Sequence, residues 1–183
     1  MEPFYEKTIK RKEIFQGKII SLHVDDVELP DGNFSKREVV THPGAVAIIA
    51  ITPEGKLLLV KQFRKPLERA ILEIPAGKIE AKEAPEVTAL RELEEETGYS
   101  AKALHPVTSF YTSPGFANEI IYLYRAEGVY PLEEKVKGDE DEFLEVVELP
   151  LDEAQAYLDE QKIHDAKTAF AILYLSLREK GRC

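Results

Sequence analysis

The sequence predicts an α/β (α+β) fold, because short strand-like runs and helical stretches are interspersed along the chain. Residues 45–51 (AVAIIAI) are an apolar run rich in branched side chains between two turns, which is typical of a buried strand. Residues 85–97 begin with proline and are followed by Gly98, which is typical of a helix. Hydrophobic residues make up 44% and charged residues 32% of the chain. This composition indicates a globular protein with a buried core.

The N-terminal part is predicted to be a small antiparallel sheet. Residues 5–41 alternate in the manner of strands and break at residues 30–33 (PDGN), a turn by composition. Pro43 and Gly44 then precede the first buried strand. We therefore divide the chain into residues 1–42, a set of antiparallel strands, and residues 43–183, the main domain.

The main domain is predicted to continue with strands on both sides of one helix. Its further strands are residues 56–64 (KLLLVKQFR), 71–77 (ILEIPAG), 107–113 (VTSFYTS), 119–126 (EIIYLYRA) and 143–149 (FLEVVEL). Two helices near residues 151–160 and 165–180 follow, with Asp165 as the expected N-cap and Gly181 as the expected C-terminal stop.

Charge and composition exclude several classes of protein. The formal net charge of −10 argues against binding to a nucleic-acid backbone, but a divalent cation would allow a phosphate ligand. The longest apolar run is too short to span a bilayer, and no charged-then-apolar leader opens the chain. The single cysteine, Cys183, precludes an intrachain disulfide, so we expect a cytoplasmic location.

The helix at residues 85–97 carries an unusual group of acids. With Leu90 at zero on a wheel of about 100° per residue, Val87, Leu93 and Thr97 fall within about 60° of it. Three carboxylates, those of Glu92, Glu95 and Glu96, fall on the opposite side. The wheel predicts that the apolar stripe is buried and that the carboxylates point away from it.

These acids repel one another at i,i+3 and i,i+4, and the last turn of a helix disfavours anions. Arg91 is the only cation in the run that offers relief. A bound Mg²⁺ or Mn²⁺ would resolve the repulsion, because hard cations take carboxylate oxygens. The alternative is a solvated acidic helix face, and helix geometry alone leaves both interpretations open.

The spacing of this segment resembles the Nudix box of the Nudix hydrolases. The matching positions are Gly77, Glu83, Arg91, Glu92, Leu93, Glu95, Glu96 and Gly98. Tyr99 stands at the last position of the box, where an aliphatic residue is usual. The resemblance implies an α/β/α sandwich with a mixed sheet, in which the helix is held between sheets.

The resemblance also implies roles for the box residues. Glu92 and Glu96 would bind the metal, and Glu95 would be a further ligand or an auxiliary base. Arg91 would orient the glutamates. Two other box positions, Glu83 and Gly77, would be a structural partner and the tight loop before the helix, and the carbonyl of Ala76 would be available to the metal. The implied cofactor is Mg²⁺, with Mn²⁺ as a substitute.

A second acidic cluster, residues 138–142 (GDEDE), precedes the strand at 143–149. By itself it is typical of a solvated loop. In the ADP-ribose pyrophosphatase branch of the family, which the chain resembles, an acidic loop in this region supplies the catalytic glutamate. Glu142 is the first candidate for this role and Glu140 the second.

Several segments between residues 37 and 150 resemble that same branch, including REVVTHPGAVAI, QFR, LEIPAGKIE and SPGFANEIIYLYRA. Pro114 lies sixteen residues beyond Gly98 in a Ser-Pro-Gly setting, as expected for that branch. By matching position, the implied substrate-binding residues are Arg37, Arg64, Glu73, Pro114, Gly115 and Glu119. Each of the charged ones is alternatively a plain surface residue, and Phe4 or Tyr5 is a candidate to stack on adenine.

The implied reaction is Mg²⁺-dependent hydrolysis of ADP-ribose to AMP and ribose 5-phosphate. The alternatives are hydrolysis of another nucleoside diphosphate sugar, such as GDP-mannose or a UDP-sugar, and a Nudix domain that senses a nucleotide without cutting it. The resemblance further implies a homodimer in which residues 1–42 pack on the partner and complete its pocket. No nucleic-acid or membrane partner is expected.

Overall fold

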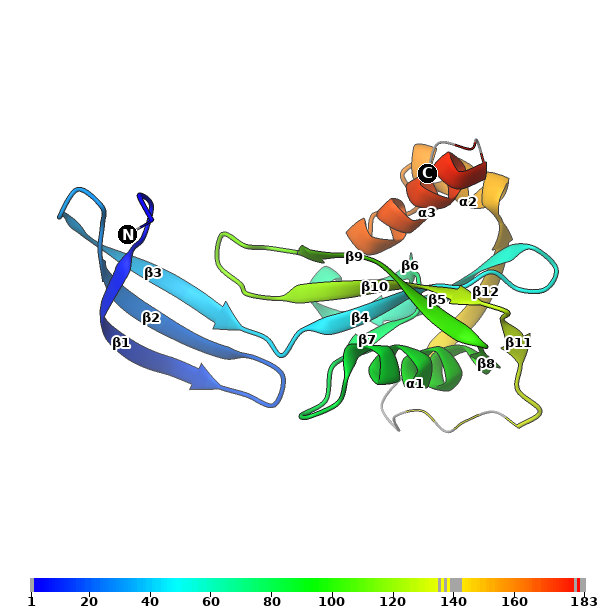
Figure 1. Ribbon diagram of the computed structural model, residues 1–183, viewed down its shortest axis with the longest axis horizontal. Coiled ribbons are helices and arrows are strands. Elements are labelled where there is room, and N and C mark those ends of the chain that lie inside the picture. The colour runs from blue at the N-terminus through cyan, green and yellow to red at the C-terminus, as the bar shows by residue number, and fades with distance from the viewer. Residues whose placement is uncertain (1, 135, 137, 139–142, 180, 182–183) are drawn as a thin grey trace. The chain divides into compact units, whose positions relative to one another are not determined.

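The computed structural model describes the chain except for residues 1, 135, 137, 139–142, 180 and 182–183 (Figure 1). The chain forms two compact units. The first unit comprises residues 1–45 and 109–121, and the second comprises residues 46–108 and 122–183.

The first unit contains a three-stranded antiparallel sheet in the order β1-β2-β3. Its strands are β1 (Lys7–Gln16), β2 (Ser21–Glu28) and β3 (Phe34–Thr41). The turn between β2 and β3 is closed by Asp31, whose carboxylate accepts the backbone N–H of Asn33 at 3.0 Å. The predicted antiparallel strands and the predicted turn at residues 30–33 are thereby confirmed.

The first unit also includes a loop from much later in the chain. Residues 112–119 connect β9 (Ala103–Tyr111) to β10 (Ile120–Glu127). The N–H of Val40 donates to the carbonyl of Phe116 at 2.7 Å, and the N–H of Asn118 donates back to the carbonyl of Val40 at 3.2 Å. These backbone bonds attach the loop to the end of β3.

The second unit is built on three sheets. A four-stranded sheet has the order β7-β4-β10-β9, a three-stranded antiparallel sheet the order β12-β5-β6, and a two-stranded sheet pairs β11 with β8. The elements not yet named are β4 (Ala45–Ile49), β5 (Lys56–Arg64), the 3-10 helix η1 (Lys65–Leu67), β6 (Arg69–Glu73), β7 (Ala76–Lys78), β8 (Tyr99–Ser100), β11 (Tyr130–Pro131) and β12 (Leu144–Pro150). The predicted strands at residues 45–51, 56–64 and 143–149 are confirmed. The predicted single strand at residues 71–77 is wrong, because the chain there forms two strands, β6 and β7, in different sheets.

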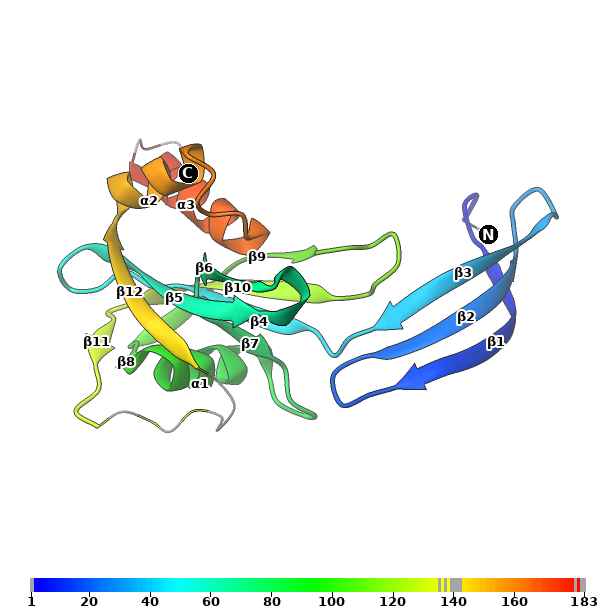
Figure 2. The ribbon, with the colours of Figure 1, turned by 180° about the vertical axis from the view of Figure 1, so that it is seen from behind.

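The described part of the chain has three α-helices, α1 (Pro85–Thr97), α2 (Leu151–Asp159) and α3 (Ala166–Glu179). Figures 1 and 2 show α1 on one side of strands β4 and β5, and α2 and α3 on the other side. This layering confirms the predicted α/β/α arrangement. None of the helices in the described residues is long and apolar enough to cross a membrane.

Local chemistry explains where α1 begins and ends. Pro85 occupies the first turn, where a missing N–H has no consequence. Gly98 adopts a left-handed conformation with φ of 73°, and its N–H donates to the carbonyl of Glu94 at 2.9 Å. Glycine reaches this conformation without steric cost. Both predicted ends of the helix are confirmed.

The core of the second unit lies between α1 and the sheets. Its buried apolar side chains are Val46, Ile48, Ala50, Leu58, Ala89, Leu93, Ala101, Ala126 and Val129. Leu93 is fully buried and anchors α1 to this cluster. Burying such a side chain stabilises a fold by about 1.5–3 kcal/mol, so the helix is held firmly by its inner face.

Candidate active site

Arg91 lies at the centre of the acidic group on α1. Its Nη1 donates to Glu92 at 2.8 Å and to Glu95 at 2.9 Å. Its Nε and Nη2 donate to the two oxygens of Glu83 at 3.1 and 3.0 Å. One guanidinium thus binds three carboxylates, which raises the pKa of Arg91 above its ordinary value. These hydrogen bonds to one cation offset the repulsion among the neighbouring carboxylates of α1.

Glu83 is the residue that orients Arg91. It lies in the loop before α1 and accepts a further hydrogen bond from the hydroxyl of Thr88 at 2.8 Å. The hydrogen bonds from Arg91 are the main reason that the pKa of Glu83 falls from 4.5 to about 2, against an opposing effect of burial. Glu83 therefore stays ionised and keeps the guanidinium in place.

The structure corrects the predicted orientation of α1. Val87 was predicted to pack but its side chain is 57% exposed, whereas Glu92 and Glu96 are buried beside Leu93. The predicted burial of Leu93 and Thr97 is confirmed. The wheel was wrong about Val87 and the two acids because it assigned the interior by apolarity alone. The real buried face includes small and acidic residues, since partners within the fold satisfy the carboxylates.

Glu96 and Glu92 both contact the strand that precedes the helix. The backbone N–H of Ala76 donates to the carboxylate of Glu96 at 2.9 Å. A Cβ added at Gly77 would lie 1.9 Å from the carboxyl carbon of Glu92, closer than any real contact. Gly77 lies within β7 and is not among the glycines with positive φ. Its box position therefore requires glycine for close approach to Glu92, and the predicted tight-loop role is corrected.

The donor set fits a hard divalent cation. Glu92, Glu95 and Glu96 supply carboxylate oxygens from adjacent turns of one helix, and such oxygens are the ligands that Mg²⁺ and Mn²⁺ prefer. Within the described residues, however, no three acidic, histidine or cysteine side chains already stand in metal-ligand geometry. Arg91 and the N–H of Ala76 hold carboxylate oxygens instead.

A second ion pair joins Arg64, the last residue of β5, to the buried carboxylate of Glu73, the last residue of β6. Nε and Nη2 of Arg64 donate to the two oxygens of Glu73 at 2.6 and 2.9 Å. Glu73 is 2% exposed, whereas the side chain of Arg64 is 40% exposed. The hydrogen bonds that Arg64 donates to Glu73 raise the pKa of Arg64, and the charges of Glu96 and Asp165 add to the effect.

Lys167 also contacts this ion pair, and it was not predicted from the sequence. Its Nζ contacts Glu73 and donates to Asp165 at 2.9 Å. One signal was available, because a lysine in the first turn of a helix faces an unfavourable dipole. Asp165 was predicted only as an N-cap, and this role is confirmed by its 2.9 Å bond from the N–H of Thr168.

The remaining candidates lie in the first unit or outside the described residues. In the first unit, Arg37 donates from Nε and Nη2 to Glu6 at 2.8 and 2.6 Å. Glu119 accepts a bond from Thr112 and lies 3.7 Å from Nδ1 of His42. Pro114 and Gly115 form the turn closed by the bond from the N–H of Ala117 to the carbonyl of Ser113 at 2.9 Å. Glu140 and Glu142 lie outside the described residues.

Tyr99 is the one residue that departs from the box pattern, and its ring and its hydroxyl have different roles. Its ring packs against the core cluster of the second unit, as an aliphatic residue would. Its hydroxyl donates to Glu148 of β12 at 2.8 Å, and this bond raises the pKa of Tyr99 to about 12. The substitution therefore keeps the packing and adds a link between the end of α1 and β12.

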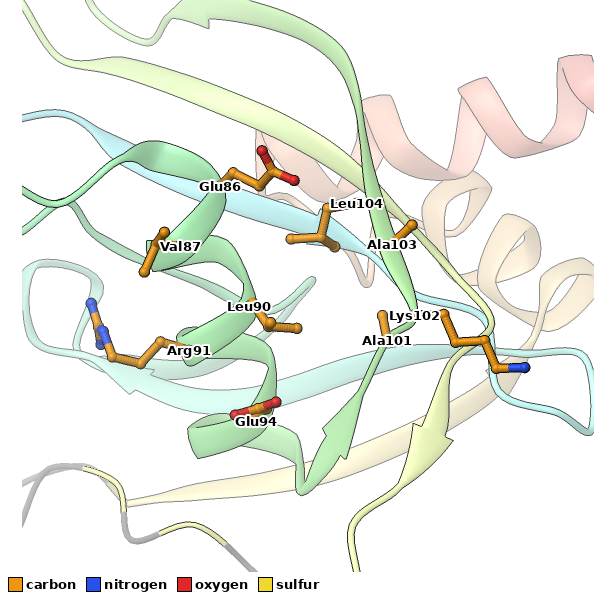
Figure 3. Close-up of a pocket in the computed structure, with 9 residues that line it drawn as sticks. All are labelled: Glu86, Val87, Leu90, Arg91, Glu94, Ala101, Lys102, Ala103 and Leu104. Atoms are coloured by element: carbon orange, nitrogen blue, oxygen red, sulfur yellow. The ribbon is translucent and has the colours of Figure 1, made fainter.

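A cavity of about 430 Å³ lies on the outer face of α1 (Figure 3). Its lining residues are Glu86, Val87, Leu90, Arg91, Glu94, Ala101, Lys102, Ala103 and Leu104. Figure 3 shows α1 on one side and the segment leading into β9 on the other, with the head of Arg91 pointing away from that segment. Glu92, Glu95 and Glu96 do not line the cavity, whereas Arg91 does.

Comparison with known proteins connects this geometry to a family. The chain matches the family model described as NUDIX domain over residues 41–170, and the one described as nucleoside diphosphate sugar hydrolase N-terminal domain over residues 6–40. It is 60% identical over 179 residues to an ADP-ribose pyrophosphatase of Bacillus subtilis (strain 168), covering 98% of this chain and 97% of the relative.

A second relative is a methanol dehydrogenase activator of Bacillus methanolicus, 58% identical over 176 residues, with 96% of this chain and 95% of the relative covered. Among solved structures, the fold matches a crystal structure of an ADP compounds hydrolase with a TM-score of 0.81 and 23% identity, covering 97% of each chain. The predicted resemblance is confirmed: this chain belongs to the Nudix hydrolase family, in the branch that contains the ADP-ribose pyrophosphatases.

Proposed function

We propose that this protein hydrolyses the diphosphate bond of ADP-ribose, releasing AMP and ribose 5-phosphate, with Mg²⁺ as the required ion. The observation that carries the proposal is the 60% identity, over nearly the full length, to an ADP-ribose pyrophosphatase. The intact box glutamates and their common partner Arg91 support an enzyme rather than a nucleotide sensor. Another nucleoside diphosphate sugar, such as GDP-mannose or a UDP-sugar, is the nearest alternative substrate.

The acidic group on α1 is proposed to hold the metal. Bound Mg²⁺ would neutralise diphosphate charge and lower the pKa of a water. Glu92, Glu95 and Glu96 would supply carboxylate oxygens, with the carbonyl of Ala76 beside them. Arg91 keeps two of these carboxylates within one hydrogen-bonded group, so their positions depend on each other.

Arg64 is proposed to bind a phosphate of the substrate. A guanidinium carries five N–H donors, and Glu73 uses two of them in a fixed, bidentate pair. The other donors belong to a side chain that is partly exposed, while the charge of Glu96 acts on it. Arg64 is thus oriented by Glu73 and able to contact an anion.

A glutamate of the acidic segment is proposed as the general base, with Glu142 preferred and Glu140 as the alternative. The changes Glu140→Gln and Glu142→Gln, made singly, should give one severe loss of kcat with KM little changed. The reason is that a base acts on the proton of the attacking water and not on substrate binding. Two mild effects would place the base elsewhere.

Residues 1–42 are proposed as a dimerisation element ahead of a hydrolase domain at 43–183. In the described chain the N-terminal sheet carries large exposed apolar side chains, including Phe15 and Phe34. Such surfaces mark interaction sites when they are contiguous. In the proposed dimer, Arg37 would serve the neighbouring subunit's site, and Glu119 with the turn at Pro114 and Gly115 would line the substrate.

A substrate panel tests the proposed reaction. The protein is incubated with Mg²⁺ and, separately, ADP-ribose, GDP-mannose, UDP-glucose, NADH or 8-oxo-dGTP, and the products are identified by chromatography. We expect ADP-ribose to be cleaved fastest and to yield AMP, with no turnover in excess EDTA. A clear preference for another compound would refute the substrate assignment while leaving the reaction class in place.

A second candidate function is activation of a methanol dehydrogenase, supported by the 58% identity to such an activator. The test adds this protein to a purified methanol dehydrogenase and follows alcohol oxidation. Comparison of the wild-type protein with the Glu96→Gln variant shows whether activation requires hydrolysis. No change in dehydrogenase rate at any ratio of the two proteins would exclude this function.

A further inference from the structure

Lys167 is a buried cation in an unfavourable place. It is 7% exposed and is the second residue of α3, where the positive end of the helix dipole repels a cation. Lysine is almost never fully buried unless it is paired. Its position therefore requires compensation from nearby anions, and the structure provides two of them.

These two anions are Glu73 and Asp165. Nζ of Lys167 contacts Oε2 of Glu73, the oxygen that also accepts Nη2 of Arg64, and it donates to Oδ1 of Asp165 at 2.9 Å. Burial by itself would raise the pKa of Glu73, but the hydrogen bond from Arg64 and the charge of Lys167 outweigh it and lower that pKa. Glu73 is thus an ionised carboxylate shared between two cations.

The same turn of α3 also holds the backbone next to Glu73. Oγ1 of Thr168 accepts the N–H of Ile74 at 2.8 Å and donates to Oδ2 of Asp165 at 2.6 Å. Two residues further along, the N–H of Ala76 binds Glu96. The start of α3 therefore contacts both the side chain of Glu73 and the backbone that leads to the acidic group.

The second contact of Glu73, with Lys167, affects how much positive potential Arg64 offers to an anionic ligand. If Arg64 were the only cation bound to Glu73, the two opposite charges would cancel and form a neutral pair. A second cation on the same oxygen satisfies part of the carboxylate's charge. Arg64 then keeps its bidentate orientation while more of its positive potential remains for an external anion.

We propose that Lys167 is a positioning residue for substrate binding, which acts by sharing the Glu73 carboxylate and so orients Arg64 toward the diphosphate. This inference rests on the proposed function, in which Arg64 contacts the substrate. Lys167 itself does not touch the substrate. Its effect is transmitted through one carboxylate.

The first test compares Lys167→Met and Lys167→Arg with Lys162→Met, measured as KM and kcat for ADP-ribose at saturating Mg²⁺. Lys162 is a matched control, since it is an exposed lysine just ahead of α3 that pairs with Glu160. We expect Lys167→Met to raise KM about tenfold or more with a smaller change in kcat, as for loss of binding common to ground and transition states. Lys167→Arg, which keeps the charge, should restore most of the affinity, and Lys162→Met should match the wild type.

The second test is a double-mutant cycle with Arg64→Ala. If Lys167 acts through Arg64, Lys167→Met will not raise KM further in the Arg64→Ala background. A KM increase that is equal in both backgrounds overturns the inference and leaves the proposed role of Arg64 intact. A wild-type KM for Arg64→Ala itself refutes that proposed role and, with it, the inference.

Folding of the variants is followed by circular dichroism. Should Lys167→Met fail to fold, Lys167→Gln replaces it, because glutamine removes the charge but can still donate a hydrogen bond to Glu73. The same rise in KM is then expected. If neither variant folds while Arg64→Ala does, Lys167 serves the fold and the inference is wrong.

Discussion

The two units of the chain differ in what surrounds their most unusual side chains. The second unit buries charge: Glu73, Glu92, Glu96 and Lys167 are all below 10% exposed. The first unit exposes large apolar groups, with Phe15 at 56% and Phe34 at 72%. Charged side chains are rarely buried unless they are paired, and exposed apolar side chains are informative when they lie together on one face.

The buried acids of the second unit and the exposed phenylalanines of the first unit differ in the partners that the chain provides for them. In the second unit Arg91 pairs with Glu92, and both Arg64 and Lys167 pair with Glu73. Glu96 accepts the backbone N–H of Ala76. In the first unit Phe15 and Phe34 share one face of the sheet, since they lie opposite Leu22 and Glu28 of β2. Covering such an apolar sheet face is favourable, because it removes apolar surface from water. The second unit supplies the partners of its buried acids itself, whereas the exposed phenylalanines of the first unit are the basis of the proposed dimer interface.

The largest effect is expected from Glu96→Gln. The amide oxygen of glutamine can still accept the N–H of Ala76, so folding should be retained. Loss of a carboxylate ligand should lower Mg²⁺-dependent kcat by about 10²-fold or more. The measurement is steady-state hydrolysis of ADP-ribose over a range of Mg²⁺ concentrations.

Glu94→Gln is the matched control for that variant. Glu94 lies on the opposite side of α1, lines the outer cavity and accepts the hydroxyl of Ser100 at 2.7 Å. This change should leave kcat within about twofold of the wild type, since a surface substitution away from the site has a small effect. Near-wild-type activity of Glu96→Gln would remove that residue from the metal site.

The next effect is expected from Gly77→Ala. The added Cβ must displace the Glu92 carboxylate, because it would otherwise lie 1.9 Å from its carbon. We expect a loss of about 1–3 kcal/mol in the free energy of unfolding and a fall in turnover of about tenfold or more. Urea denaturation and kinetics measure the two effects.

The double variant Gly77→Ala/Glu92→Asp separates the steric clash of the new Cβ from the role of the Glu92 carboxylate in catalysis. Aspartate is one methylene shorter and moves the carboxyl group away from the new Cβ. Stability should therefore be largely restored while activity stays low. An unchanged stability in Gly77→Ala alone would show that β7 can move away from α1 without cost.

A smaller effect is expected from Phe15→Ser/Phe34→Ser in the first unit. Both side chains are exposed in the single chain, so the fold should be little affected. If the sheet face is a dimer interface, the dissociation constant should rise by about tenfold or more, given about 1.5–3 kcal/mol per buried phenylalanine. Sedimentation equilibrium measures it, with Leu67→Ser in the second unit as control. A monomeric wild-type protein would show that this sheet face is not a dimer interface.

The smallest effect concerns pH. The pKa of Glu83 is about 2 in the folded protein against an ordinary 4.5, so its ion pair with Arg91 stabilises the fold above pH 4.5. This contribution is lost as the pH falls from 4.5 toward 2. Glu83→Gln should therefore be less stable than the wild type at pH 6, and the difference should shrink at pH 3. Urea midpoints at both pH values test this, and a constant difference would contradict it.

Much of the local structure could be predicted because its signals lie within a few residues of each other. Pro85 and Gly98 marked the ends of α1, and Asp165 marked the start of α3. The box spacing identified the family. The orientation of α1 was not predictable from apolarity, because Glu92 is buried on account of Arg91 and of the missing side chain at Gly77.

The amino-acid order alone determined most of the longer strands, the helix ends and the acidic box, since backbone preferences and helical periodicity act over one or two turns. The tertiary structure alone decided which acids are buried and which cations compensate them. Lys167 meets Glu73 across 94 residues of chain. No local pattern encodes such a pair, because its energy depends on the burial and on the partners that only the folded chain brings together.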